Sequence, residues 1–180
     1  MKKTIILALL FSTINGLSAQ EGYSGFDAKF GTGFGFMGSG DMRSLSFENE
    51  LNYKINRYFT AAVSIGFGKS EIGAYEHTDY LMGSINLFVS PFSNSKSNNL
   101  KIGGGASFFN QTNIYLKSWS SLEGSTFDFY RHKTNGFNVI IEDEQCIGSN
   151  LLIGVKLFLT GGVAQGGIIF GSMLKFGVKL

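Results

Sequence analysis

The chain has few of the residues that cross-link or hydrate a soluble protein. Its 180 residues include one cysteine, Cys146, and one proline, Pro91, and only 16% of the residues are charged. A single cysteine cannot form an internal disulfide, so the fold does not depend on covalent cross-links. The scarcity of lysine and glutamate, beside 43% hydrophobic residues, is unusual for a surface that faces water.

The chain also lacks a large excess of charge of either sign. The formal charge is +2, but Lys2 and Lys3 lie in a predicted leader. Removing two of the 15 basic residues leaves 13, which balance the 13 acidic ones. A nucleic-acid-binding or anionic-surface-binding function therefore has no support from charge.

Residues that bind metals or dinucleotides are equally sparse. The two histidines, His77 and His132, are isolated, and with one cysteine they give no metal-ligand spacing. Gly31, Gly33 and Gly35 alternate with larger residues and precede no helix, so they do not form a dinucleotide-binding loop. The sequence predicts no cofactor and no metal.

The first residues have the pattern of an export signal. Lys2 and Lys3 precede an apolar run over residues 4–11, and Gly16, Ser18 and Ala19 are small residues of the kind a signal peptidase accepts. The pattern predicts a signal peptide over residues 1–19 and a single mature domain over 20–180. No apolar run of transmembrane-helix length follows it.

What the mature chain does have is a two-residue period. In residues 168–180 every even position is apolar except Ser172, while the odd positions include glycines and lysines. Such alternation predicts a strand, and 25 glycines and 18 phenylalanines with one proline favour strands over helices. The acidic residues 142–145 interrupt the alternation on both faces and leave the ends of the sixth strand open. The period predicts eight strands, near residues 23–36, 45–55, 59–68, 78–89, 100–109, 137–141, 151–159 and 168–180.

Two orientations of these strands are compatible with the period. A soluble lipocalin-like barrel would turn its apolar side inward, and a membrane barrel would turn it toward lipid. The polar side consists largely of glycine, serine and threonine with scattered charges, which suits a narrow interior in which charges pair. The sequence therefore predicts an all-β, eight-stranded, antiparallel up-and-down transmembrane β-barrel whose phenylalanines face lipid. The charges predicted to lie inside are Asp27, Lys29, Glu48, Glu50, Lys101, Lys156 and Lys175.

Connection lengths predict which end of the barrel faces outward. A tight turn is expected at Asn56 and Arg57 and another at Ser149 and Asn150, whereas residues 110–136 are expected to form a long external loop. The mixture of aromatic and basic residues in this loop indicates a contact surface. The candidate contact residues are Trp119, Phe127, Phe129, Tyr130, Arg131 and His132.

Several segments resemble a known family. The leader ending in SAQ, the segment FGTGFGF, the hairpin LNYKINRYFTAAVSIGFG and the end LKFGVKL are similar to the small eight-stranded outer-membrane β-barrel proteins of Gram-negative bacteria. The resemblance implies an integral protein of the cell outer membrane, surrounded by outer-membrane lipid and lipopolysaccharide. It also implies insertion by the barrel assembly machinery, although the last residue is Leu180 where the family usually has an aromatic residue. A monomer is expected.

Three functions remain open from the sequence. The first is a non-enzymatic membrane anchor whose external loops serve surface contact or envelope integrity. The second is a lipid A modifying enzyme, because RHKTNG resembles the His-x-Ser-Asn stretch of outer-membrane deacylases. In that enzyme His132 would be the base and Thr134 the nucleophile, with Glu142 or Glu144 orienting the imidazole. The third is a secreted lipocalin-like carrier of an apolar ligand.

Overall fold

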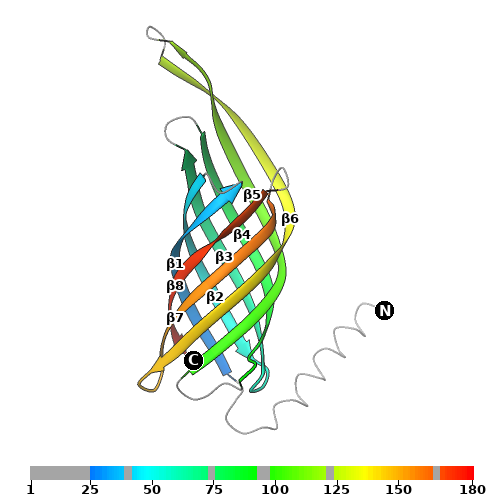
Figure 1. The fold of residues 1–180 in the computed structure, drawn as a ribbon, viewed down its shortest axis with the longest axis vertical. Helices are drawn as coiled ribbons and strands as arrows, with labels where there is room; N and C mark the ends of the chain where they lie inside the picture. Colours follow the sequence, from blue (N-terminus) through cyan, green and yellow to red (C-terminus); the bar gives the residue numbers. More distant parts are fainter. Residues whose placement is uncertain (1–24, 39–41, 73–75, 93–97, 121–123, 164–166) are drawn as a thin grey trace, which may run out of the picture.

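The computed structural model describes residues 25–38, 42–72, 76–92, 98–120, 124–163 and 167–180 of the chain. They form eight antiparallel strands in chain order, and β8 pairs with β1 to close a barrel (Figure 1). The predicted fold class and strand number are confirmed. The predicted signal peptide lies outside the described residues. The strands are β1 (Gly25–Gly38), β2 (Met42–Lys54), β3 (Phe59–Ile72), β4 (Glu76–Val89), β5 (Asn98–Ser120), β6 (Gly124–Ile147), β7 (Leu151–Val163) and β8 (Gly167–Lys179).

The start of β1 and the end of β8 lie at the same end of the barrel. The backbone N–H of Leu180 donates to the Phe26 carbonyl at 2.8 Å, and the Lys179 N–H donates to the Asn150 carbonyl at 2.9 Å. The predicted turns at residues 56–57 and 149–150 are confirmed, and both lie at this end. In the β2–β3 turn the Asn56 side-chain oxygen accepts from the backbone N–H groups of Tyr58 and Phe59.

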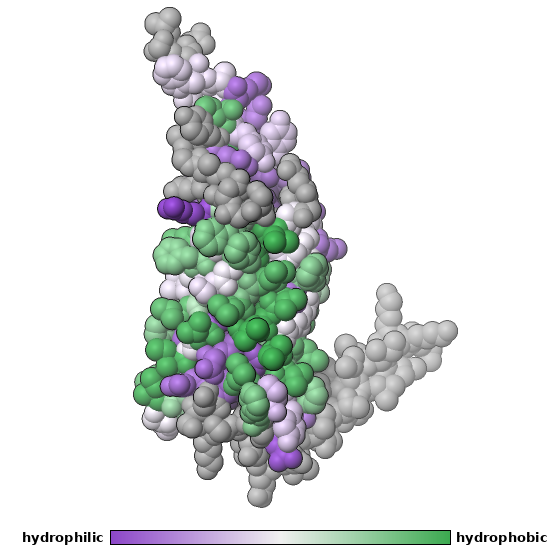
Figure 2. Space-filling model, viewed as in Figure 1, coloured by the Kyte–Doolittle hydropathy of each residue, from purple (hydrophilic) through white to green (hydrophobic). Residues whose placement is uncertain are grey.

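Alternate side chains face opposite sides of the wall, as the two-residue period requires. On β2 and β4 buried and exposed residues alternate along most of the strand. The outward set is mostly apolar on every strand and forms a belt around the barrel, one face of which is the green zone of Figure 2. The phenylalanine-rich side therefore faces outward, as predicted. Members of the belt are Phe26, Phe34, Leu51, Ile65, Ile85, Phe108, Val139, Leu157 and Phe176.

This belt rules out the soluble carrier. A carrier in water would bury its apolar face around the ligand, whereas here Phe34 is 73% exposed and Ile85 is 60% exposed. A continuous band of this kind is stable where hydrocarbon surrounds it, and closure of the barrel pairs the backbone groups of the wall. The part of the chain that the structure describes contains no candidate membrane-spanning helix.

The prediction of a long loop over residues 110–136 is wrong. The fifth strand continues past Phe109 to Ser120, and the sixth begins at Gly124, so most of the segment is a two-stranded hairpin. In Figure 1 this hairpin extends far beyond the rest of the barrel, at the end opposite the C-terminus. The strands were missed because the apolar residues that mark the belt give way to polar ones above it.

Past the belt, β6 has a strand partner on one side only. It pairs with β5 from end to end, but with β7 only from Phe137, opposite Gly161, to Ile147, opposite Leu151. β7 ends at Val163, after a bulge against β8 at Gly162. The φ of Gly162 is 82°, which favours glycine, and a Cβ there would lie 2.5 Å from the Asn135 carbonyl oxygen. Within the described chain, residues 124–136 of β6 therefore present a free strand edge.

Candidate functional site

The lumen holds a cluster of four lysines and four glutamates, which we call the charge cluster. Its side chains come from six of the eight strands, and every member is at most 5% exposed. The two signs balance, so the cluster is formally neutral. The charge cluster consists of Lys29, Glu48, Glu50, Lys101, Glu142, Glu144, Lys156 and Lys175.

The lysines of the charge cluster each contact more than one glutamate. Lys156 Nζ donates to Glu48 Oε1 at 2.6 Å and to Glu50 Oε2 at 3.2 Å. Lys175 Nζ makes the same two contacts from β8, at 2.5 Å and 3.1 Å. Because buried charges are stable only when they are paired, these shared contacts join β2, β7 and β8 across the lumen.

A second set of ion pairs joins β1, β5 and β6. Lys29 Nζ donates to Glu142 Oε1 at 2.6 Å and also to Glu144. Lys101 Nζ lies 3.0 Å from both of these glutamates and 5.5 Å from the centre of the Phe88 ring. The two sets meet where Lys29 Nζ lies 3.8 Å from Glu50 Oε1. The charge cluster is thus one connected network that fills this level of the barrel.

The sequence predicted most of these interior charges. Lys29, Glu48, Glu50, Lys101, Lys156 and Lys175 all lie in the network, and Asp27 is buried beside Lys54 at 3.2 Å. Glu142 and Glu144 were instead interpreted as an interruption of the sixth strand. Continuing the outward positions 137, 139 and 141 by steps of two would have placed both glutamates inside.

Hydrogen-bonded polar side chains continue the filling above the charge cluster. Asn138 Nδ2 donates to Asn86 Oδ1 at 3.0 Å, and Asn86 Nδ2 donates to Ser84 Oγ at 2.9 Å. The Ser84 and Ser64 hydroxyls lie 2.7 Å apart, and Ser64 Oγ donates to Glu48 at 3.3 Å. A chain of hydrogen bonds therefore runs from β6 to β2 and ends on the charge cluster.

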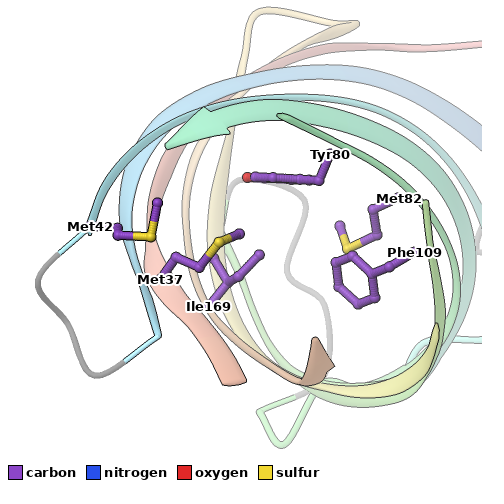
Figure 3. Close-up of a cluster of buried hydrophobic side chains, with 6 residues drawn as sticks. All are labelled: Met37, Met42, Tyr80, Met82, Phe109 and Ile169. Carbon is purple, nitrogen blue, oxygen red and sulfur yellow. The ribbon is translucent and has the colours of Figure 1, made fainter. Parts of the chain in front are cut away.

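Apolar side chains close the lumen above this polar chain, and we call them the apolar lid. Met37 and Ile169 reach in from one side, Met82 and Phe109 reach in from the other, and the Tyr80 ring extends between them (Figure 3). The Tyr80 hydroxyl oxygen lies 2.5 Å from the Ser46 hydroxyl oxygen. Below the lid is a cavity of about 20 Å³, room for roughly one water molecule. The apolar lid consists of Met37, Met42, Tyr80, Met82, Phe109 and Ile169.

The projecting hairpin, β5 and β6 beyond the belt, carries the predicted contact residues. Trp119 is 71% exposed and Phe129 is 69% exposed, so both rings are available to a partner. Phe127, Tyr130 and Arg131 are exposed and His132 is half-buried. The structure places the six residues on two paired strands, where the sequence predicts a loop. Phe127, Phe129 and Arg131 lie on one face of the hairpin, and Tyr130 and His132 lie on the other.

The hairpin is held by local contacts. Lys117 Nζ donates to Asp128 Oδ1 at 3.3 Å in an exposed ion pair, and the Ser118 and Thr126 hydroxyls lie 2.6 Å apart. The Tyr115 and Tyr130 rings meet edge to face, with centroids 5.9 Å apart. Burial, followed by the nearby Glu76 carboxylate, raises the pKa of Tyr115 above its ordinary value.

The proposed deacylase residues are not assembled into a triad. His132 and Thr134 lie on β6, and Glu142 lies further along the same extended strand. His132 and Glu142 are ten residues apart on this strand, which corresponds to about 33 Å. Thr134 and Glu142 are eight residues apart, which corresponds to about 26 Å. Glu142 and Glu144 are bound to Lys29 and Lys101 instead. Neither glutamate can orient the imidazole, so this part of the enzyme hypothesis is wrong. Among the described residues, no group of histidine, cysteine and carboxylate side chains could hold a metal ion.

Comparison with known proteins gives likeness in structure alone. No protein-family model and no curated protein matches the sequence. The N-terminal β-barrel domain of Pseudomonas aeruginosa OprF has a TM-score of 0.56 at 9% identity, over 87% of this chain and 99% of that chain. The P. aeruginosa outer membrane protein OprG has a TM-score of 0.57 at 10% identity, over 88% of this chain and 98% of that one. The chain has the fold of the eight-stranded outer-membrane β-barrels.

A third structure of this fold is Ail, the attachment invasion locus protein of Yersinia pestis. In its complex with the heparin analogue sucrose octasulfate, Ail has a TM-score of 0.56 at 14% identity, over 89% of this chain and 100% of that chain. At these identities the likeness shows the shared fold. Combined with the apolar belt, it makes the present chain an integral β-barrel of the outer membrane.

Proposed function

We propose that this protein is a non-enzymatic outer-membrane anchor whose sealed barrel holds the projecting hairpin outside the cell, where the hairpin contacts a partner. The observation that carries the proposal is the contrast along β5 and β6. Below, β5 and β6 are part of a barrel whose lumen is filled by the charge cluster, the polar chain and the apolar lid. Above, the two strands leave the barrel with aromatic rings exposed. Rigid aromatic and basic side chains on a paired scaffold are suited to binding.

The filled lumen supports an anchor rather than a pore. An eight-stranded barrel is just wide enough to be filled by its own side chains, and the cavity below the lid has room for roughly one water molecule. In planar bilayers we expect the purified protein to give no steady ion conductance. A stable open conductance in the wild-type protein would contradict the sealed barrel.

The chemistry of the hairpin indicates the type of partner. Arg131 and Lys133 are exposed directly above the belt, at the height of lipid headgroups, and the free edge of β6 runs beside them. Cationic side chains here suit the phosphates of lipopolysaccharide, whereas Trp119 and Phe129 further out suit a host surface or another surface protein. Contact at either level would also serve envelope integrity.

The test is to shorten the hairpin while keeping the belt. The barrel wall loses only the three pairs that residues 113–115 make with residues 76–78 of β4. Residues 113–130 are replaced by Asn-Gly, so that the pair Thr112 and Arg131 flanks a two-residue turn. We expect cells with this variant to lose adhesion to host cells or to become sensitive to detergent, as cells without the protein do. Proper insertion is checked by the different gel mobility of boiled and unboiled samples.

A matched pair of variants then assigns the effect to the aromatic rings. Trp119→Ser with Phe129→Ser removes the exposed rings, and Thr126→Ala with Ser118→Ala alters the same hairpin without touching them. We expect the first pair to reproduce the shortened hairpin and the second to behave as wild type. If the shortened hairpin leaves adhesion, detergent resistance and cross-linking to neighbours unchanged, the contact function is wrong.

A further inference from the structure

The outward face of β2 carries one amide within the apolar belt. Asn49 is exposed on the outer wall, between Phe47 and Leu51 along its own strand. Across the neighbouring strands it lies beside Phe30 of β1 and Ile65 of β3, both exposed and apolar. Asn49 is therefore surrounded by the belt on all four sides.

An amide at this depth lacks the partners it would have in water. Its side chain offers two donors and one acceptor, and hydrocarbon offers none in return. The structure gives the Asn49 side chain no partner among the described residues. Leaving such a group unpaired in an apolar medium is unfavourable, so polar residues inside a membrane usually mark a contact or a site.

Other polar residues of the outer wall are better placed. The exposed amide of Asn110 lies toward the hairpin, opposite Lys133 of β6, and Thr32 carries only one hydroxyl. Asp143 and Gln145 lie near the β6–β7 turn, within reach of the headgroups at that end. Ser172 has a single hydroxyl, which requires less hydrogen bonding than an amide. Asn49 is thus the polar side chain of the described outer wall that most needs a partner within the bilayer.

The wall around Asn49 is hollowed. A groove of about 840 Å³ runs over β8, β1, β2 and β3, with the small Ala28 and Asn49 side chains between larger ones. Its rim includes Phe30, Ile65 and Phe176, which are roughly half exposed. A shallow groove flanked by apolar side chains lets a second wall approach closely enough for short polar groups to meet.

We propose that two copies of this protein associate in the plane of the membrane through this groove, with their Asn49 amides hydrogen-bonded to each other. A two-fold axis along the membrane normal places the same residue of both copies at the same depth, so the amide of one copy meets the amide of the other. An amide is its own complement, since each can donate to the oxygen of the other. A lipid or a different membrane protein need not carry an amide at the depth of Asn49, whereas a second copy of this protein always does. The proposal is independent of the projecting hairpin.

The first experiment counts copies in a membrane. The full protein, labelled on its only cysteine, Cys146, is placed in phosphatidylcholine vesicles at several protein-to-lipid ratios and examined by single-molecule photobleaching. We expect two-step bleaching to increase with protein density. Asn49→Leu should weaken the association about tenfold, the scale of a polar contact between membrane segments, and Asn49→Gln should retain most of it. Ser172→Leu, a polar-to-apolar change outside the groove, should have no effect.

The second experiment locates the contact. In a Cys146→Ser background, Asn49→Cys should form a disulfide-linked dimer on mild oxidation, whereas Ile141→Cys, on β6 at the opposite wall, should not. Single-step bleaching of the wild type at every density would overturn the proposal and leave the expected monomer. Association that Asn49→Leu does not weaken, or equal cross-linking from both positions, would also overturn it.

Discussion

The two halves of β6 have the same two-residue period but face different surroundings. Between Phe137 and Ile147 the strand pairs on both sides. Phe137, Val139 and Ile141 face outward there, and Glu142 and Glu144 face inward. Between Gly124 and Gly136 it pairs with β5 alone, and Arg131, Lys133 and Asn135 face outward together with exposed aromatic rings. The period therefore indicates the strand, and the polarity of the outward face indicates the medium.

The same comparison applies to ion pairs. In the barrel, Lys29 is almost completely buried and contacts three glutamates. On the hairpin, the side chains of Lys117 and Asp128 are 63% and 39% exposed. Water screens the second pair and not the first, so the two pairs differ in what their loss costs.

The largest expected effect is the loss of a buried lysine. Lys29→Met leaves Glu142 and Glu144 without one of their two cations, and breaking a buried ion pair costs about 3–5 kcal/mol. Urea unfolding in lipid vesicles, followed by gel mobility, measures the change in the free energy of unfolding. Lys117→Met on the hairpin should change it by less than about 1 kcal/mol. Equal effects of the two substitutions would show that the charge cluster is not shielded from water.

A smaller effect is expected from a charge on the outward face of β6. Val139→Arg places a cation in the belt and should lower the free energy of unfolding by about 2–4 kcal/mol. Phe129→Arg, outward on the same strand but on the hairpin, should change it by less than about 0.5 kcal/mol. The same unfolding assay checks both. A Val139→Arg variant as stable as wild type would mean that this part of the wall does not touch hydrocarbon.

The smallest effect is expected from shortening the hairpin. Replacing residues 113–130 by Asn-Gly removes strand pairs that lie mostly beyond the belt and should alter the free energy of unfolding by about 1 kcal/mol or less. A much larger loss of stability would show that the hairpin supports the barrel. In that case the loss of function expected for this variant could not be assigned to contact.

Residues whose surroundings follow from period alone were predicted well. Phe34, Ile85 and Lys101 were placed on the correct side because each lies in a strand whose two faces differ strongly. The alternation fails at residues 142–145, where charges stand on both faces, and the sequence could not tell an interior glutamate from an interruption. Extending the two-residue period through this segment resolves the ambiguity, because it places Glu142 on the interior face.

The candidate site was predicted only in composition. Trp119 and Phe129 were recognised as exposed aromatic residues, but their strands were not, because above the belt no apolar alternation marks a strand. The pairing of residues 110–120 with 124–134 depends on both segments, and neither segment reveals it alone. Because residues 124–136 were not recognised as part of the sixth strand, the distance between His132 and Glu142 could not be predicted.

The most direct test of the account is the accessibility of single spin labels along β6. In a Cys146→Ser background, labels at residues 127, 129, 131, 137, 139 and 141 are exposed to lipid-soluble oxygen and to a water-soluble nickel complex in vesicles. We expect oxygen to dominate at positions 137, 139 and 141 and nickel to dominate at 127, 129 and 131. Preferential access of the nickel complex to position 139 would contradict the claim that the phenylalanine-rich face meets hydrocarbon.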